Sequence, residues 1–428
     1  MPGNRLPEQE HVSRKRRLVR IGAALLVLSF AFLISGAAGE IALSQTREKL
    51  ANAEFFTARK WLTLADWLGT DAAESAFLHA RIYRKLGEFD EMASSLKLAS
   101  EAGLSQSKIQ LEHLLAQAQS GNVSPLESRL AALLVAGDDL SEICEAFVAG
   151  CLITYQLDEA LLLLDKWLAD FPENAQAHFL RGRIYEYRSG KDVAESEYRL
   201  AIKFAPGHSP ARYGLGRLLT DASPKEAIAQ FELCAEYHIN PQPGLVAVSR
   251  CQRLVGNLSQ ARETIERAIA SKPENHELAY RLLGEPAETA ASQAPAEYGH
   301  ILLALKDLPG AEKWYLQALH SNPNDWRTRF SLATAQRQLG KTDEALINLT
   351  RVEKTRNALA ECDTAFDSLR EDSENVEARF LIGKTLLEHV SERQGRIWLE
   401  SVLRYAPSHE GARKLLMTLD HKTEPSVN

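Results

Sequence analysis

A pattern of residues recurs about every 34 positions through most of this 428-residue chain, and this period limits the fold more than any other feature. In one copy, Ala194 is followed by Tyr198, Ala201 and Pro206 at fixed spacings. The same spacings return in three further copies, which begin at Ala160, Ala261 and Ala311. A fixed period of about 20–50 residues is typical of stacked repeats, each of which is one small structural unit. We therefore expect a long repeat array.

The spacing within each copy predicts two helices. A small residue eight places into the copy, such as Gly182, lets the first helix lie close against the second, and an alanine near position 20 does the same from the other side. The proline at position 32 cannot continue a helix, so the second helix ends before the next copy begins. Helices of about 12–15 residues are unstable alone in water, so neighbouring copies must stack to bury a continuous core. The sequence therefore predicts an all-α chain.

These positions resemble the tetratricopeptide (TPR) family, in which a small residue is followed three places later by an aromatic or aliphatic residue, as in Gly182 and Tyr185. The resemblance extends from about residue 73 to residue 409. It implies a right-handed superhelical solenoid of helix-turn-helix repeats with one concave face. About nine repeats are expected, with starts near residues 73, 107, 141, 175, 209, 242, 292, 326 and 376.

The array is not uniform along the chain. We expect a degenerate unit at 39–72, which keeps only its second helix convincingly, and then an array at 73–275. Sixteen extra residues follow at 276–291, where a short helix and a turn are expected. The array resumes at 292–359, and a second insert at 360–375 is expected to lengthen the preceding helix. A last repeat at 376–409 and a capping helix with a loose tail at 410–428 complete the chain.

The N-terminal region has the features of a membrane anchor. After a basic tail at 1–17, a transmembrane helix is expected at 18–38, because the run from Ile21 to Ala38 has no charged residue and can just span a bilayer. Six Lys or Arg residues precede this run, so the positive-inside rule places the N-terminus in the cytoplasm and the repeats outside it, with a bacterial inner membrane as the expected site. The alternative is a signal peptide whose cleavage would release an exported protein.

Composition and motifs argue against several classes of protein. The net charge of −7 argues against nucleic acid as a partner. The five cysteines include no CxxC pair, so neither a zinc site nor a disulfide framework is expected. No HExxH, GxSxG or Walker motif is present. We therefore expect no catalysis, no cofactor and no metal.

The predicted concave face combines basic and aromatic residues, although the chain is acidic. First helices of TPR repeats contribute most of that face, and Arg and aromatic residues are the types that concentrate binding energy. Because Arg pairs with carboxylates, an acidic segment or a free C-terminus is the expected ligand. The opposing interpretation is that these arginines pair with carboxylates of the protein itself, such as Glu186 and Asp221. The candidate groove residues are Arg81, Arg84, Phe179, Arg183, Tyr213, Arg217, Arg250, Arg253, Phe330, Arg337 and Lys384.

These features favour a membrane-tethered scaffold that binds a protein or a peptide, in envelope assembly, secretion or export. Two alternatives remain at this point. The chain could be an accessory or enzyme-associated subunit whose inserts at 276–291 and 360–375 complete a site. It could also be a structural array that associates with itself.

Overall fold

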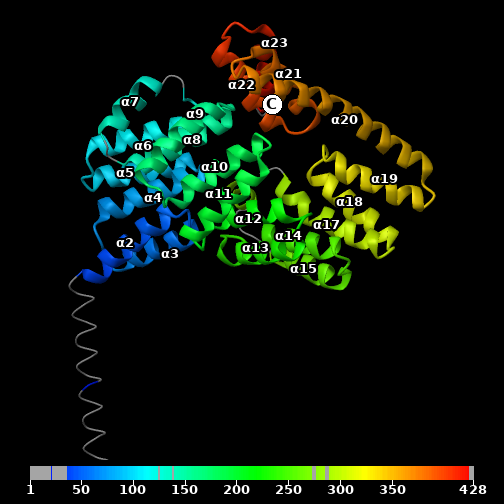
Figure 1. Ribbon diagram of the computed structural model, residues 1–428, viewed down its shortest axis with the longest axis horizontal. Coiled ribbons are helices and arrows are strands. Elements are labelled where there is room, and N and C mark those ends of the chain that lie inside the picture. The colour runs from blue at the N-terminus through cyan, green and yellow to red at the C-terminus, as the bar shows by residue number, and fades with distance from the viewer. Residues whose placement is uncertain are drawn as a thin grey trace, which may run out of the picture. The chain divides into compact units, whose positions relative to one another are not determined.

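The computed structural model describes Ile21 and residues 36–123, 126–136, 139–271, 276–284 and 289–423. Within these ranges every regular element is a helix, which confirms the all-α prediction (Figure 1). The chain divides into two compact units, one ending at His113 and the other beginning at Leu114, with the boundary inside α6 (Gln106–Gln119). We describe each unit by itself.

The first unit contains two helix pairs and the start of α6. The prediction that 39–72 keeps only its second helix is wrong, because both helices of that unit are formed. The buried side chains of Ala42, Leu43 and Leu50 on the first of them supply the apolar face that a helix pair requires. The helices of the pairs are α2 (Ala37–Ala51), α3 (Phe55–Trp67), α4 (Ala72–Leu86) and α5 (Phe89–Glu101).

The predicted transmembrane helix falls almost entirely outside the described residues. Of 18–38, the structure describes Ile21 and 36–38, and α2 already begins at Ala37. Among the helices that the structure does describe, none combines the length and the apolar character needed to cross a bilayer. The predicted basic tail at 1–17 and residues 424–428 also lie outside the described ranges.

The second unit continues the series of helix pairs. Each predicted repeat start lies within two residues of the first residue of a helix, so the sequence period gives the register of the helices correctly. The helices that follow α6 are α7 (Glu127–Ala136), α8 (Leu140–Thr154), α9 (Leu157–Asp170), α10 (Ala175–Tyr187), α11 (Lys191–Phe204), α12 (Ser209–Leu219), α13 (Pro224–Tyr237), α14 (Gln242–Leu254), α15 (Leu258–Ala270), α16 (His276–Leu282), α17 (Ala290–Ala304), α18 (Leu308–Ser321), α19 (Trp326–Gln338), α20 (Thr342–Glu371), α21 (Val376–His389), α22 (Glu392–Tyr405) and α23 (Glu410–Thr423).

The two inserts have different structures. In the first, the short helix α16 ends in a turn at Gly284, whose φ of 81° lies in the left-handed region that glycine tolerates. In the second, residues up to Glu371 continue α20, which is 30 residues long and runs from α19 to α21 (Figure 1). The insert therefore separates α21 from α19 by lengthening a helix rather than by adding one.

Glycines allow the paired helices to approach each other, as the sequence predicted. A Cβ on Gly182 would lie 2.7 Å from the ring of Tyr198 on the partner helix α11, and one on Gly214 of α12 would lie 2.8 Å from the same ring. The ring of Tyr198 is fully buried between these two backbones. A Cβ on Gly383 would likewise lie 3.0 Å from Leu399 of α22.

A side chain four places into several repeats fixes the turn that precedes the repeat. The guanidinium of Arg212 donates to the carbonyl oxygen of Pro206 at 2.7 Å, and Arg329 donates to Pro323 in the same way. Nε2 of His178 is hydrogen-bonded to the carbonyl oxygen of Pro172 at 2.9 Å. In the last repeat, Arg379 donates to the carbonyl oxygen of Ser373 at 3.0 Å. Each acceptor lies six residues before its partner, so this is a recurrent device of the array.

Arg379 also joins an early helix and a late helix of the second unit. Its guanidinium is fully buried and donates to the carbonyl oxygen of Thr154, at the end of α8, at 2.8 Å. Beside it, the ring of Tyr155 lies 5.6 Å from the rings of both Phe366 on α20 and Trp398 on α22. We call these five residues the seam. It brings the last repeat of the unit back against α8, so the helices enclose an interior space.

Candidate functional site

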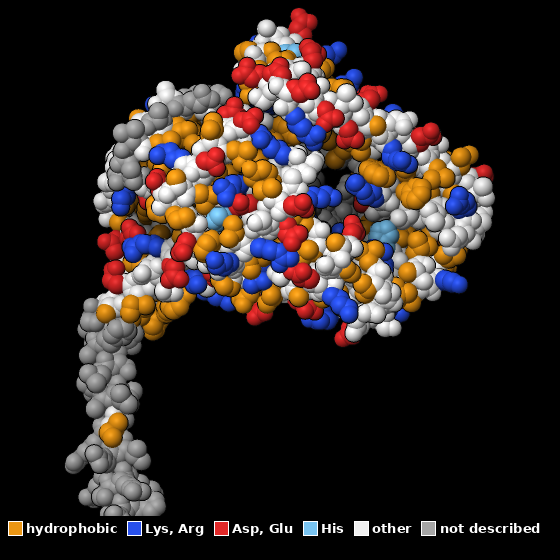
Figure 2. All heavy atoms as spheres, viewed as in Figure 1, with side chains coloured by type: hydrophobic (Ala, Val, Ile, Leu, Met, Phe, Trp, Pro, Cys, Tyr) orange, Lys and Arg blue, Asp and Glu red, His pale blue; other side chains and the backbone are white. Residues whose placement is uncertain are grey.

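Three adjoining hollows form one inner surface in the second unit, with volumes of about 260, 880 and 1000 Å³. They share lining residues: Arg183 belongs to the first and second, Arg217 to the first and third, and Phe366 to the second and third. Figure 2 shows the molecule hollowed in this region, with blue Lys and Arg side chains beside the opening. We call the three hollows together the inner cavity.

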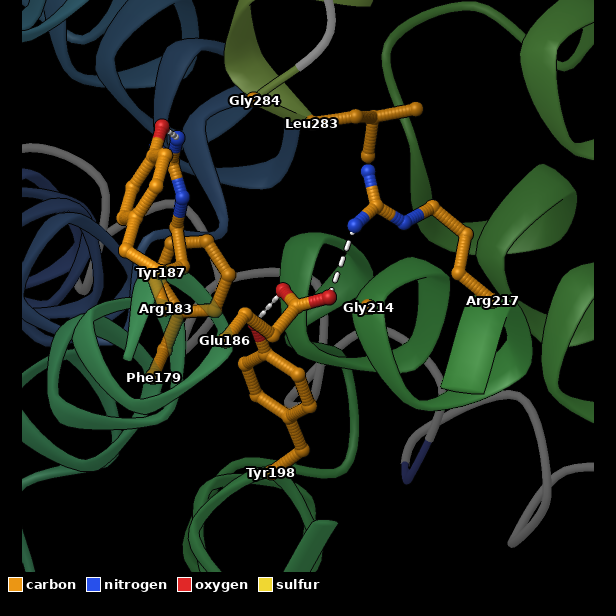
Figure 3. A pocket seen from close by; sticks show the side chains of 9 residues that line it. All are labelled: Phe179, Arg183, Glu186, Tyr187, Tyr198, Gly214, Arg217, Leu283 and Gly284. Atoms are coloured by element: carbon orange, nitrogen blue, oxygen red, sulfur yellow. Dashed lines mark hydrogen bonds and ion pairs between the residues drawn. The ribbon is translucent and has the colours of Figure 1, made fainter. Parts of the chain in front are cut away.

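The smallest hollow lies between α10, α11, α12 and the end of α16 (Figure 3). Glu186 accepts a hydrogen bond from the hydroxyl of Tyr198 and another from Arg217 at 2.7 Å. Burial, reinforced by the carboxylate of Glu186, raises the pKa of Tyr198, so this hydroxyl stays a donor. Arg183 donates instead to the hydroxyl of Tyr187 at 3.2 Å. Glu186 is therefore already bonded on both oxygens, whereas Arg183 meets a neutral group.

The largest hollow contains a second arginine–carboxylate cluster. Glu297 on α17 is 1% exposed and accepts from the guanidinium of Arg253 at 2.6 and 3.2 Å. Nε of Arg250, one turn earlier on α14, lies 3.6 Å from Oε2 of the same carboxylate. A buried carboxylate needs such partners, because an isolated charge in a protein interior is costly. These two arginines therefore stabilise Glu297 as well as lining the cavity.

Further arginines enter the inner cavity from α16, α19, α20 and α22. The guanidiniums of Arg327 and Arg356 lie 4.7 and 6.0 Å from the ring of Trp326, within the range of a cation–π interaction. Arg370 is bonded to Asp367 one turn earlier on α20. Arg281 and Arg393 line the second hollow.

Positive charge predominates on this surface. The described lining residues include nine arginines, no lysine, and five carboxylates, an excess of four positive charges in a chain of net charge −7. Most of the carboxylates already have partners, since Glu186, Glu297 and Asp367 bond arginines and Asp325 accepts from the first backbone amides of α19. The inner cavity is thus suited to a ligand that brings its own negative charge.

The predicted candidates in the second unit divide into two groups. Six of them line the inner cavity: Phe179, Arg183, Tyr213, Arg217, Arg250 and Arg253. Their arrangement differs from the prediction in one respect, because the rings of Phe179 and Tyr213 are buried rather than exposed beside the arginines. Each ring packs on its own repeat, Phe179 5.9 Å from Tyr198 and Tyr213 5.4 Å from Phe231.

The other candidates lie elsewhere. Phe330, Arg337 and Lys384 are exposed and line none of these three hollows. Arg81 and Arg84 belong to the first unit, where both bond the fully buried carboxylate of Glu112, at 2.8 and 2.6 Å. The placement of Arg84 on an open groove is wrong, because its side chain is completely buried in this ion pair. Its role in the first unit is to keep a buried charge paired.

The sequence did not lead us to predict several residues that line the inner cavity. The prediction considered first helices only, whereas Arg356 and Arg370 project from the long second helix α20, and Arg393 and Trp398 from α22. These second helices reach the interior because the seam turns the last repeat toward α8. For α20 the sequence did contain an indication, the insert predicted to lengthen this helix. A longer second helix changes which of its residues face inward.

The buried histidines of the second unit have structural roles. Nδ1 of His208 accepts from the backbone amide of Ala211 at 3.1 Å and caps α12, while Nε2 bonds the carbonyl oxygen of the Gln176 side chain at 2.9 Å. Burial lowers the pKa of His208 to about 3, so the ring is neutral with its hydrogen on Nε2. Among the described residues, no group of three His, Cys, Asp or Glu side chains could hold a metal ion. The five cysteines are buried free thiols.

Comparison with known proteins identifies the repeats in two stretches. Family models described as "Tetratricopeptide repeat" match residues 156–209 and 314–347. No curated protein matches the chain. The predicted number of nine repeats stays a prediction, because the matched stretches contain only part of the array.

Solved structures with helical repeats are similar at low identity. PilW, described as a widely conserved type IV pilus biogenesis factor, is 16% identical with a TM-score of 0.43, over 51% of this chain and 94% of that chain. The Cut9–Hcn1 hetero-tetramer of the APC/C is 15% identical with a TM-score of 0.40, over 91% and 88%. YrrB, described as a TPR protein with an unusual peptide-binding site, is 16% identical with a TM-score of 0.23, over 59% and 97%.

The assignment therefore depends on the two matched stretches and on the register of the helices. Both stretches coincide with helices that the structure pairs: 156–209 contains α9, α10 and α11, and 314–347 contains most of α18 and all of α19. The chain is an all-helical protein in which residues 156–209 and 314–347 match tetratricopeptide-repeat models.

Proposed function

We propose that the second unit is a scaffold that binds an acidic, extended protein segment in its inner cavity, without catalysis. The observation that carries this proposal is the excess of arginine over carboxylate among the lining residues, in a chain that is acidic as a whole. Arginine offers paired donors that match a carboxylate, and a sheltered bond of this kind contributes roughly 1.5–3 kcal/mol. Several such bonds along one segment are enough for specific binding.

The enclosure of the inner cavity favours a segment over a folded domain. The seam joins α8 to the last repeat, so a ligand must reach the interior as an extended chain or as a chain end. A free C-terminus adds one carboxylate to those of acidic side chains. Aromatic rings at the seam offer apolar contact to the side chains between the acids.

The test uses the full chain and a defined probe. We would measure by fluorescence anisotropy the affinity of a labelled peptide of alternating Glu and Gly residues, and of the same peptide with Gln in place of Glu. The Glu peptide should bind at least tenfold more tightly, and added salt should weaken its binding, because screening reaches partly exposed charges.

The variant that tests the site replaces Arg183, Arg327 and Arg356 with Met. Within the described ranges, the contacts of these three side chains are with rings and a hydroxyl and not with a buried carboxylate, so the fold should persist while affinity for the Glu peptide falls at least tenfold. The matched control replaces Arg199 and Arg262 with Met, since both are exposed and pair with neighbours on the outer helices. Equal loss in both variants, or tight binding of a short oligonucleotide in place of the peptide, would overturn the proposal.

We also propose that residues 18–38 tether the protein to a membrane, with 1–17 in the cytoplasm and the repeats on the other side. The uncharged run from Ile21 to Ala38 and the basic residues before it support this topology. Mass spectrometry of the protein purified from its own membranes tests it. An intact N-terminus supports the anchor, whereas a new N-terminus after residue 34 supports signal-peptide cleavage.

Other results of these experiments would favour one of two different functions. A mass in detergent that is a multiple of the single chain would favour a self-associating array. Co-purification with an enzyme whose activity depends on residues 276–291 or 360–375 would favour an accessory subunit.

A further inference from the structure

The outer face of α3 carries a stripe of exposed side chains that includes two aromatic rings. Phe56, Lys60, Thr63 and Trp67 follow one another at spacings of four, three and four residues, so they lie on one side of the helix. The opposite side, with Ala58, Leu62 and Ala65, is fully buried.

Large apolar side chains on this stripe are unusually open to solvent. The side chain of Trp67 is 75% exposed, more than any other large apolar residue that the structure describes. Phe56 is 38% exposed, and Leu64, at the edge of the stripe, is 40% exposed. A Trp that is exposed to this degree has apolar surface that a membrane or a binding partner could cover.

The charges near the stripe are positive. Lys60 lies 4.1 Å from the centre of the Phe56 ring, and Arg59 is exposed beside it. The one carboxylate on this part of α3, Asp66, is turned toward α4, where it bonds the hydroxyl of Ser75 and Nε2 of His79. The exposed face therefore combines apolar rings with basic side chains.

The stripe ends beside the start of α2. A Cβ on Gly39 would meet the side chain of Thr70 and would lie 3.8 Å from the Cβ of Leu68, so the first turn of α2 touches the residues that follow Trp67. The uncharged run of the sequence reaches this contact, since the first charged residue after it is Glu40. Figure 2 shows orange side chains gathered over α2 and α3, beside the place where the described chain begins.

We propose that this face of α3 rests on the surface of the bilayer, with Trp67 among the lipid headgroups. The inference rests on the proposed tether: where residues 18–38 leave the membrane, the contact between Gly39 and Thr70 holds Trp67 at the same level. Trp is enriched at this level because its ring is apolar and its N–H needs a hydrogen-bond partner. Arg59 and Lys60 lie on the same face and would meet anionic headgroups.

The test reconstitutes the full chain into vesicles of phosphatidylcholine and phosphatidylglycerol. Some vesicles contain lipids brominated near the headgroup end of the acyl chain, which quench a Trp that lies close to them. Trp67→Phe removes one of six tryptophans and keeps an apolar ring, and Trp326→Phe is the matched control in the second unit. Bromolipid should quench the emission of the parent and of Trp326→Phe, and most of this quenching should disappear in Trp67→Phe.

Flotation of the vesicles separates the two proposals. If the chain does not float with vesicles, the tether is wrong, and the lipid contact of α3 is wrong with it. If the chain floats but quenching is the same in Trp67→Phe and in the parent, the tether stands and the contact is refuted. Circular dichroism of both variants should match the parent, because neither ring is part of the buried core.

Discussion

Substitution of Arg379 with Met tests whether the second unit closes on itself. Arg379 resembles Arg329 in one contact, since each donates to the carbonyl oxygen six residues before it. It differs in a second contact, the bond to Thr154 at 2.8 Å across the seam. Arg329→Met is therefore a control that removes bonds within one repeat, those to Pro323 and Asn348, and none across the seam. Arg379 also donates to Ser401 of its own repeat at 3.3 Å, as Arg329 donates to Asn348, so exchange at the end of α8 is the readout that reports the bond across the seam.

The magnitude follows from the nature of that bond. A hydrogen bond from a charged donor contributes roughly 1.5–3 kcal/mol, and its loss leaves the buried carbonyl of Thr154 without this donor. If local opening at the end of α8 becomes easier by that amount, amide hydrogens there should exchange about ten- to a hundredfold faster, since about 1.4 kcal/mol is a factor of ten. Met keeps most of the side-chain volume, so a cavity adds little to the effect.

Hydrogen exchange followed by mass spectrometry reads this effect at residues 150–157. Arg379→Met should accelerate exchange in that peptide, and Arg329→Met should leave it as in the parent. Each variant should also accelerate exchange in its own repeat, which shows that the substitution acts locally as intended. Equal exchange at 150–157 in the two variants would refute the closure of the unit.

Three further predictions concern packing, pH and topology. Gly182→Leu should lower the free energy of unfolding by about 1–3 kcal/mol, because its Cβ would lie 2.7 Å from the Tyr198 ring; an unchanged thermal melt would mean that the helix contact is misplaced. The pKa of His208 is about 3 in the folded protein and about 6.5 in the unfolded chain, so below pH 6.5 the unfolded state binds the proton and stability falls by up to about 1.4 kcal/mol per pH unit. His208→Asn keeps a helix cap and should reduce this slope between pH 7 and pH 5 in urea unfolding; parallel curves would contradict it. Cys144 should react with a membrane-impermeant thiol reagent in intact, denaturant-treated cells, and reaction only after lysis would reverse the proposed orientation.

The sequence predicts the local structure well because the repeat pattern reports local packing. Gly182 and Gly383 are small since a neighbouring side chain lies within 3.0 Å of where a Cβ would be, and the same requirement recurs at Gly216 and Gly299. The prolines at position 32 mark where second helices end and also accept the bonds from Arg212 and Arg329. Such constraints act over one repeat, so they are visible in the period itself.

The inner cavity was only partly predictable, because its geometry accumulates over many repeats. The bond from Arg379 to Thr154 joins residues 225 apart, and its existence depends on the sum of small rotations between neighbouring helix pairs. The pairing of Arg253 with Glu297 crosses the first insert, so a fixed period could not give its register. By contrast, Arg217 and Glu186 lie in consecutive repeats, and the sequence did suggest their pairing.

Binding in the inner cavity and closure of the seam should stabilise each other. The second hollow is lined both by Arg183 on α10 and by Arg393 and Trp398 on α22, so a ligand that fills it contacts both sides of the seam. A ligand that binds only the closed form stabilises it by about 2.7 kcal/mol at a concentration of 100 times its Kd. The Glu peptide at saturation should therefore slow exchange at residues 150–157 in the parent, and should restore part of the protection lost in Arg379→Met. A peptide that binds tightly but leaves this exchange unchanged in both proteins would show that the ligand occupies only one side of the inner cavity.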